Sequence, residues 1–248
     1  MKPQSPALQT DIPAMILAAG RGARMRPLTD ACPKPLLEVR GKPLMEWPMQ
    51  ALHDHGFKRL VINTAWLGDQ IEARFASWPA SHPDARLVFS HEGRDFGSAL
   101  ETAGGIARAL PQLGEVFWVL AGDVYAPDFG FEPDDVRQFA QSGHLAHLWL
   151  VPNPPHNPQG DFGLSGDGMA LNEAASRFTF STMALYRRDL FEPPWFDVKP
   201  GNPEGVAAPL APLLRAAIAA GRVSASLYTG SWTDVGTPER LAELNSGR

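Results

Sequence analysis

Glycines and cations gather in one short stretch near the N-terminus, LAAGRGARMRPLTDACPKPLL over residues 17–37. Gly20 and Gly22 carry no Cβ, so backbone N–H groups there can approach an anion closely. Arg24, Arg26 and Lys34 can add charge-assisted hydrogen bonds to the same anion. These residue types at this spacing predict a site for a polyphosphate.

The stretch differs from the two commonest phosphate-binding loops. A Walker A loop needs G-x-x-x-x-G-K-[ST], and the sequence contains no such run. A dinucleotide fingerprint needs G-x-G-x-x-G, but Met25 stands where the third glycine should be. The sequence therefore predicts a polyphosphate site of another type and disfavours a nucleotide-binding dehydrogenase.

Short apolar runs alternate with amphipathic segments along the first half of the chain. The runs at residues 13–20, 59–65, 85–90, 115–123 and 144–151 predict strands, and a further strand is expected at 176–191. Helices are expected at residues 43–56, 67–78, 99–114, 132–143 and 211–221. This order predicts an α/β doubly wound core with a mostly parallel sheet. Pro48 falls inside the first expected helix, so that helix should bend or begin late.

Length and composition bound the classes of protein to consider. The chain has 248 residues, of which 44% are hydrophobic and 20% charged, and its formal net charge of −5 argues against a broad nucleic-acid-binding face. No stretch approaches the roughly 20 apolar residues that span a bilayer, and residues 1–13 contain no apolar run like that of a signal peptide. The single cysteine, Cys32, excludes an intramolecular disulfide, and we expect a cytoplasmic protein with no membrane partner. The oligomeric state stays open, with a monomer among the states that the sequence allows.

The run GRGARMRPLTDACPKP at residues 20–35 resembles the G-x-G-x-R-x-x-P-L-T-x-x-x-P-K-P signature of the sugar-1-phosphate nucleotidylyltransferases. Two later stretches agree with that family in order and spacing: LAGDVY, which holds Asp123, and GSWTDVGTPERL, which holds Asp234. The resemblance departs at LAAG, where Ala19 replaces a glycine found in many members. It implies a Rossmann-like nucleotidyltransferase fold with a smaller sugar-binding lobe. Residues 1–248 would form one domain, with a nucleotide-binding core at about 12–150 and the sugar lobe with the second metal ligand at about 151–235.

The family resemblance also implies the chemistry. A sugar-1-phosphate oxygen would attack the α-phosphorus of a nucleoside triphosphate and release pyrophosphate, so positioning and charge neutralisation would supply the catalysis. Arg24 would neutralise the triphosphate and Lys34 would hold the phosphates at the reacting centre. Asp123 and Asp234 would be ligands of Mg²⁺. No side-chain nucleophile is needed.

Other positions are assigned by the same resemblance. The nucleotide would be bound by the first loop and by the segment that opens a later helix, at Ala18, Gly20, Gly22, Arg24, Lys34, Glu101 and Thr102. Gly104 and Gly105 would either let the ribose approach or allow close helix packing. The sugar would be bound by Asn153, His156, Asp161, Gly163 and Trp232. Turn formation is an equal alternative for the residues at 153–163.

Three runs bear on the substrate. AWLGDQIE, LETAGGI and NPPHNPQGDF most resemble the N-acetylmuramate-1-phosphate uridylyltransferases of peptidoglycan recycling, which implies UTP and N-acetylmuramate-1-phosphate as substrates. The same fold also serves mannose-1-phosphate guanylyltransferases, glucose-1-phosphate thymidylyltransferases and phosphocholine cytidylyltransferases, which remain alternatives. A non-catalytic regulatory homologue is disfavoured, because the loop cations and both aspartates are present.

Overall fold

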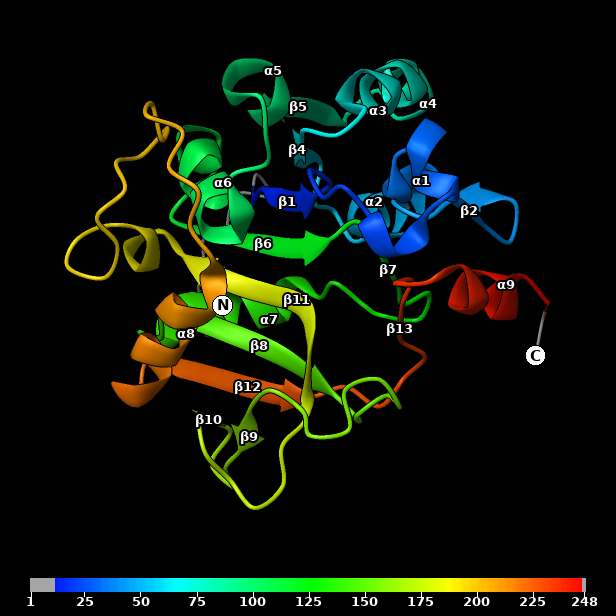
Figure 1. Ribbon diagram of the computed structural model, residues 1–248. Coiled ribbons are helices and arrows are strands. Elements are labelled where there is room, and N and C mark those ends of the chain that lie inside the picture. Colours follow the sequence, from blue (N-terminus) through cyan, green and yellow to red (C-terminus); the bar gives the residue numbers. More distant parts are fainter. Residues whose placement is uncertain (1–11, 247–248) are drawn as a thin grey trace, which may run out of the picture.

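A seven-stranded sheet forms the centre of the molecule (Figure 1). The computed structural model describes residues 12–246, so most of the N-terminal segment considered above, residues 1–11, lies outside the described part. In spatial order the strands are β12 (Val223–Leu227), β8 (Ala146–Val151), β11 (Thr179–Arg187), β6 (Val116–Ala121), β1 (Ala14–Leu17), β4 (Arg59–Thr64) and β5 (Arg86–His91). β11 runs antiparallel to β6 and β8, and the other neighbouring pairs are parallel. The predicted α/β fold with a mostly parallel sheet is confirmed.

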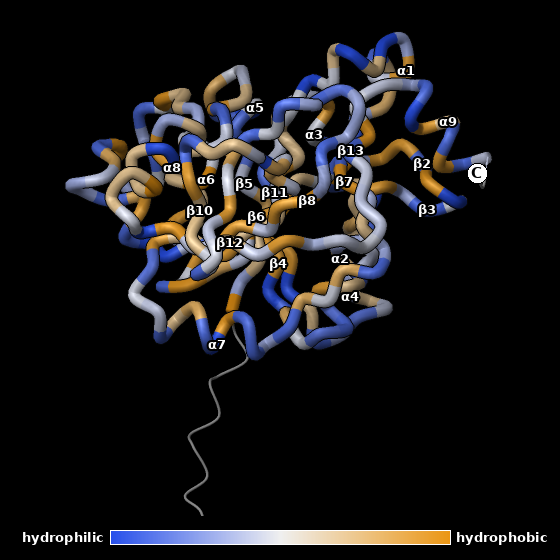
Figure 2. The backbone as a smooth tube through the Cα atoms, turned by 90° about the horizontal axis from the view of Figure 1, so that it is seen from below, coloured by the Kyte–Doolittle hydropathy of each residue, from blue (hydrophilic) through white to orange (hydrophobic). Residues whose placement is uncertain are grey.

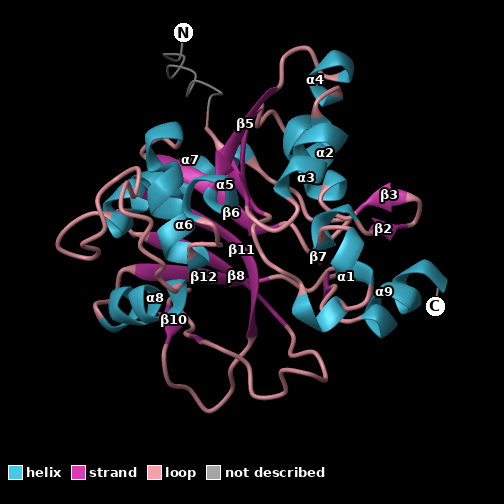
Figure 3. Ribbon diagram, turned by 45° about the horizontal axis from the view of Figure 1, so that its top comes forward, coloured by secondary structure: helices cyan, strands magenta, loops and turns pink. Residues whose placement is uncertain are grey.

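Helices cover both faces of this sheet because its strands are apolar on both sides. Met15 and Val61 pack into one core with α6 (Glu101–Ala109) and α8 (Leu210–Ala219). Ile16 and Ile62, from β1 and β4, pack into a second core with α2 (Glu46–Asp54), α3 (Gly68–Phe75) and α7 (Pro133–Ser142). Figure 1 shows α6 and α8 in front of the sheet and α7 behind it, and Figure 3 shows the strands between helices. The chain therefore folds in three layers, with hydrophobic strands inside (Figure 2).

Short elements connect and flank these layers. They are η1 (Ala23–Met25), α1 (Leu28–Ala31), η2 (Lys34–Leu36), β2 (Glu38–Val39), β3 (Lys42–Pro43), α4 (Trp78–Ser81), α5 (Glu92–Phe96), η3 (Leu110–Gln112), β7 (Val124–Tyr125), β9 (Gly163–Leu164), β10 (Ala170–Leu171), η4 (Arg188–Phe191), β13 (Thr233–Asp234) and α9 (Pro238–Ser246). Among residues 12–246, no helix is long and apolar enough to cross a membrane.

Prolines explain where several helices begin and end. α2 begins at Glu46, which places Pro48 in its first turn and confirms the late start. The expected helix at 99–114 ends as an α-helix at Ala109 and tightens into η3, which contains Pro111. The expected helix at 67–78 ends earlier, at Phe75, and the short α4 follows with Pro79 in its first turn. β12 was not predicted, because its sequence VSASL is dominated by small residues.

A third, small core attaches the C-terminal helix to the loop at residues 17–37, which is predicted to bind phosphate and is called the phosphate loop below. Met25, Val39 and Tyr125 pack together with Val235, and Leu241 of α9 packs against them. The Asn245 side chain then accepts a hydrogen bond from Arg40 N (2.7 Å) and donates one to Glu38 O (2.9 Å). These contacts hold the β2–β3 hairpin, which follows the loop, against α9. Figures 1 and 3 show α9 and β2 on the same side of the molecule.

Candidate active site

A cavity of about 890 Å³ opens beyond the carboxyl ends of β1, β4 and β6. The loop after β1, the start of α6, the inner face of β11 and the start of α8 form its walls. Most of the residues predicted for the site line it: Ala18, Gly20, Gly22, Arg24, Lys34, Glu101, Thr102, Asp123 and Asp161. Open α/β sheets present ligands at this edge, where the strand order reverses. The fold thus gathers the phosphate loop and the predicted nucleotide residues around one space.

Gly22 fixes the shape of the phosphate loop. Its φ of 64° is left-handed, and a Cβ there would lie 3.0 Å from Thr29 Cγ2 and 3.2 Å from Lys34 Cβ. Thr29 Oγ1 donates a hydrogen bond to Gly22 O at 2.8 Å. A larger residue at this position would be strained and would push the loop away from Lys34.

The cations of the loop have different partners. Arg21 lies 2.9 Å from the Asp30 carboxylate and stacks 3.6 Å from the centre of the Trp66 ring. Arg26 lies 3.2 Å from the same carboxylate. Arg24 is exposed, lines the cavity, and has no partner among residues 12–246. Its guanidinium is therefore available for an incoming anion.

Lys34 joins the loop to the end of β6. Its side chain is nearly buried and is ion-paired with the Asp123 carboxylate, which is one-third exposed. Neither charge is thus left uncompensated within the protein. A bound phosphate or cation would compete for this pair.

A buried polar network links the phosphate loop to α6. Asn63 Oδ1 accepts a hydrogen bond from Ala18 N (2.8 Å), and Asn63 Nδ2 donates one to Glu92 Oε1 (2.7 Å). Glu92 Oε2 accepts from Leu100 N at 2.7 Å, directly before α6 begins. Burial raises the pKa of the fully buried Glu92, and the hydrogen bonds from Leu100 and Asn63 oppose that rise. The network sets the distance between the two segments predicted to bind the nucleotide.

Gly104 and Gly105 allow close packing of α6. A Cβ on Gly105 would lie 2.5 Å from Glu92 Oε1, and one on Gly104 would overlap Val206 O. Ala208 O accepts hydrogen bonds from Ala103 N and Gly104 N at the start of the helix. The packing alternative therefore accounts for both glycines.

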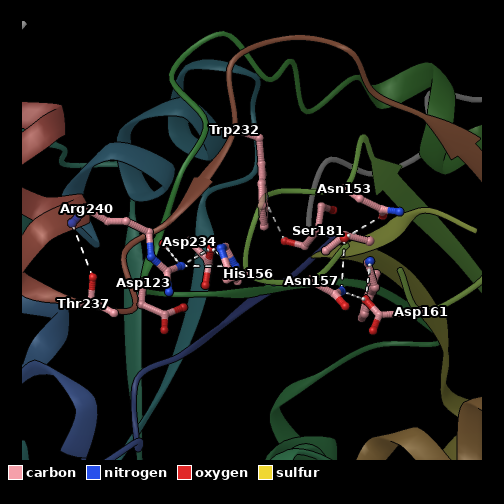
Figure 4. A network of polar contacts seen from close by, with 12 residues as sticks. Asp123, Asn153, His156, Asn157, Asp161, Ser181, Trp232, Asp234, Thr237 and Arg240 are labelled. Atoms are coloured by element: carbon pink, nitrogen blue, oxygen red, sulfur yellow. Dashed lines mark hydrogen bonds and ion pairs between the residues drawn. The ribbon is translucent and has the colours of Figure 1, made fainter. Parts of the chain in front are cut away.

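Asp123 and Asp234 lie on two paired strands. In the β7–β13 pair, Asp234 stands opposite Val124, and Val235 N donates to Asp123 O at 2.9 Å. The Asp234 carboxylate contacts Arg240 Nη1 at 2.5 Å and His156 Nε2 at 2.9 Å (Figure 4). The tertiary structure thus brings Asp123 and Asp234, which are far apart in sequence, to neighbouring backbone positions. Asp123 lines the cavity and Asp234 lies outside its lining.

This pair fits the donor chemistry of magnesium. Mg²⁺ is commonly bound through one or two carboxylates together with substrate phosphates and water. Within the described part of the chain, no three His, Cys, Asp or Glu side chains form a more complete metal-binding group. Phosphate oxygens would have to supply the remaining ligands.

The predicted sugar residues occupy different positions. Asp161 lines the cavity, and its Oδ2 accepts from Phe180 N at 2.8 Å. Asn153 lies outside the lining and donates to Arg177 O (2.9 Å), while Gly163 packs against Ala174 in the β9 turn. Trp232 also lies outside the lining, and its indole donates to Ser181 O at 3.1 Å (Figure 4).

Several residues of the cavity wall were not predicted. They are Asn63, Glu92, Thr182, Tyr186 and Arg215. Asn63 and Glu92 carried a detectable signal, because a polar residue ends one apolar strand and a carboxylate directly follows another. The other three belong to β11 and α8, which reach the cavity only through the tertiary fold.

Known proteins resemble this chain over nearly its whole length. An N-acetylmuramate alpha-1-phosphate uridylyltransferase of Neisseria meningitidis is 47% identical over 94% of this chain and 96% of its own. A protein of the same name from Caulobacter vibrioides is 31% identical over 93% of this chain and 97% of its own. A Bacillus anthracis crystal structure, provisionally assigned as a glucose-1-phosphate thymidylyltransferase, superposes with a TM-score of 0.78 at 18% identity, covering 95% and 94% of the two chains.

The family match covers most of the structure described above. Residues 13–179 match the nucleotidyl transferase family, and this range holds the phosphate loop, Asp123 and the start of α6. With the cavity, the loop and the relatives in agreement, this chain belongs to the nucleotidyl transferase family and is a sugar-1-phosphate nucleotidyltransferase.

Proposed function

We propose that this enzyme transfers a uridylyl group from UTP to N-acetylmuramate-1-phosphate. The observation that carries the proposal is the 47% identity to an N-acetylmuramate alpha-1-phosphate uridylyltransferase, which extends over almost all of both chains. An oxygen of the sugar phosphate attacks the α-phosphorus of UTP. The bond from the α-phosphorus to its bridging oxygen breaks, and pyrophosphate leaves. Peptidoglycan recycling in the cytoplasm is the setting that we propose for this reaction.

The loop cations supply the charge that this reaction needs. Arg24 has no partner in the described chain and binds the triphosphate. Lys34, held at the end of β6 by Asp123, stabilises the charge that grows on the transferring phosphate. The attacking phosphate is already ionised at neutral pH, so the site needs no general base.

Asp123 and Asp234 are the residues that would hold Mg²⁺. When bound, the metal neutralises phosphate charge. Arg240 and His156 fix the Asp234 carboxylate from the side of α9 and of the 152–163 loop. These contacts limit the rotation of the carboxylate, which favours a defined position for a ligand oxygen.

The uracil is held between the phosphate loop after β1 and the start of α6. Backbone groups at Ala18 and Gly20 line one side of the cavity, and Glu101 and Thr102 line the other. Because Asn63 and Glu92 connect these two sides, they keep the width of the base site constant.

A substrate matrix tests the proposal. The purified chain is given UTP, CTP, dTTP or GTP with Mg²⁺ and one of five acceptors: N-acetylmuramate-1-phosphate, N-acetylglucosamine-1-phosphate, glucose-1-phosphate, mannose-1-phosphate or phosphocholine. Pyrophosphate release and product mass are measured. We expect UTP with N-acetylmuramate-1-phosphate to give the highest kcat/KM, by roughly tenfold or more. Equal or better use of glucose-1-phosphate would remove the acceptor assignment, and equal use of GTP would remove the base assignment.

A further inference from the structure

One wall of the cavity carries two hydroxyl groups that the protein itself does not use. Thr182 Oγ1 and Tyr186 OH are buried and have no hydrogen-bond partner within residues 12–246. Both residues line the cavity, and Tyr186 is only 1% exposed. A buried hydroxyl without a partner is costly, so its retention beside a cavity points to a ligand.

The backbone conformation of Thr182 also points to a ligand at this wall of the cavity. Its φ of 68° is left-handed, which is rare for a β-branched residue, and it lies in the irregular part of β11 between Phe180 and Ala184. Ser181 anchors this bulge by donating to Trp149 O (2.6 Å) and by accepting from Met183 N (3.1 Å). The Thr182 side chain takes no part in these contacts. Strain that the fold does not need is typical of a functional position.

A cation completes the wall. Arg215, exposed on α8, lines the cavity and lies 5.1 Å from the centre of the Phe162 ring. Its side chain makes one long polar contact, 3.5 Å to Asn172 Oδ1, and pairs with no carboxylate in the described chain. The ring centre of Phe162 lies 6.4 Å from that of Phe180. Phe180 stands two residues before Thr182 on β11. Arg215 thus stands beside β11, on a different wall from the phosphate loop.

We propose that Thr182, Tyr186 and Arg215 form the subsite that selects the acceptor sugar, with Arg215 binding an acidic substituent on that sugar. The inference rests on the proposed function, because N-acetylmuramate carries a carboxylate that N-acetylglucosamine lacks. A guanidinium binds a carboxylate through two parallel hydrogen bonds. The two hydroxyls can donate to or accept from the neutral polar groups of the same sugar.

The first test compares two acceptors that differ by this acidic group. The ratio of kcat/KM for N-acetylmuramate-1-phosphate to that for N-acetylglucosamine-1-phosphate is measured with UTP. We expect Arg215→Gln to lower the ratio roughly tenfold or more, and Arg215→Lys to restore part of it. Arg86→Gln is the matched control, since Arg86 is exposed on β5 at the opposite edge of the sheet; it should leave the ratio unchanged.

The second test does not depend on turnover. Calorimetric titration of free N-acetylmuramic acid and of N-acetylglucosamine into the wild-type enzyme with UTP should show tighter binding of the acid. The preference should vanish in Arg215→Gln. Equal preference in wild type and variant, in both tests, would overturn the subsite while leaving the proposed function intact. Absence of uridylyl transfer to either acceptor would overturn the proposed function, and the subsite with it.

The hydroxyls are tested by variants that separate binding from stability. Tyr186→Phe removes an unpaired buried hydroxyl, and Thr182→Gly relieves a left-handed threonine, so neither should lower the Tm. Both should raise the KM for the sugar phosphate severalfold and leave the KM for UTP within twofold. An unchanged KM for the sugar phosphate in both variants would show that the hydroxyls bind no acceptor.

Discussion

Arg24 and Lys34 line one cavity but differ in what holds them, and this difference makes their roles separable. Arg24 has no partner within the described residues, whereas Lys34 is paired with Asp123. We expect Arg24→Ala to lower kcat by on the order of 100-fold, because a positive charge is lost where negative charge develops. Its Tm should stay close to that of the wild type. Lys34→Ala should lower both kcat and the Tm, since it leaves Asp123 unpaired.

Arg26→Ala is the control in the same loop. Arg26 was predicted with the other loop cations to bind the anion, but it is exposed, lies outside the cavity lining, and its side chain pairs with Asp30. We therefore expect kcat within about twofold of the wild type. Steady-state kinetics with both substrates varied, together with thermal unfolding, measure these effects. A rise in the sugar-phosphate KM alone for Arg24→Ala would place Arg24 on the acceptor side.

Asn63 is a buried residue on which the geometry of the proposed base site depends. Asn63→Ala leaves Ala18 N without its acceptor and removes one of the donors to Glu92. We expect the free energy of unfolding to fall by about 3 kcal/mol, since unsatisfied buried polar groups each cost about 1–3 kcal/mol. The KM for UTP should rise at the same time. Urea unfolding and kinetics check both, with the exposed Gln138→Ala on α7 as the control.

At the scale of elements, the β8–β12 edge of the sheet contains a pH-sensitive contact. His147 on β8 bonds through Nδ1 to Ser224 Oγ on β12 at 2.9 Å. Burial, and to a lesser degree the charge of His144, lowers the pKa of His147 to about 4 from an ordinary value of 6.5. The unfolded chain therefore takes up a proton between pH 6.5 and 4 that the native state refuses, so stability falls as the pH falls through this window.

We expect this histidine to account for about 3 kcal/mol of lost stability at pH 4 relative to pH 7. His147→Gln should unfold with a shallower pH dependence over that window, measured by urea denaturation at pH 7, 6, 5 and 4. His144, whose pKa burial also lowers, contributes in the same direction, so some slope should remain. A slope equal to that of the wild type would contradict the assignment to His147. His55→Gln at the end of α2 is the control.

At the scale of the whole molecule, ligand binding should join the parts of the site contributed by distant segments. The loop after β1, the end of β6 and the β13 strand near the C-terminus meet at Asp123 and Asp234. A ligand that binds only the native state stabilises it by about 2.7 kcal/mol at 100 times its Kd. We expect UTP with Mg²⁺ to raise the Tm by several degrees, and UTP with EDTA to raise it much less.

Asp123→Asn and Asp234→Asn should remove the Mg²⁺-dependent part of this shift and sharply reduce turnover. Thermal scans with and without Mg²⁺ separate loss of the metal site from loss of folding. Asp167→Asn, in an exposed turn outside the cavity, should retain the full shift. Full activity and a full shift in both site variants would show that these carboxylates do not hold the metal.

The sequence by itself determined the parts of this protein that depend on local pattern. Alternation of apolar runs with amphipathic segments predicted the main helices of the three layers and every strand of the central sheet except β12, because period and burial are local properties. The glycines and cations of residues 17–37 predicted a polyphosphate site, since their backbone freedom and charge act within one loop. The position of Pro48 predicted the late start of α2, because a proline constrains its own helix turn.

Only the tertiary structure decided which distant groups meet. The pairing of β7 with β13 brings Asp123 and Asp234 to neighbouring positions, and the Asn63–Glu92 network connects the two sides of the proposed base site. β11 and α8 add Thr182, Tyr186 and Arg215 to the cavity, although no motif marks these residues. Such contacts depend on how strands order themselves in the sheet and which helix covers them. Packing of the whole chain sets that order, and no local window of sequence contains it.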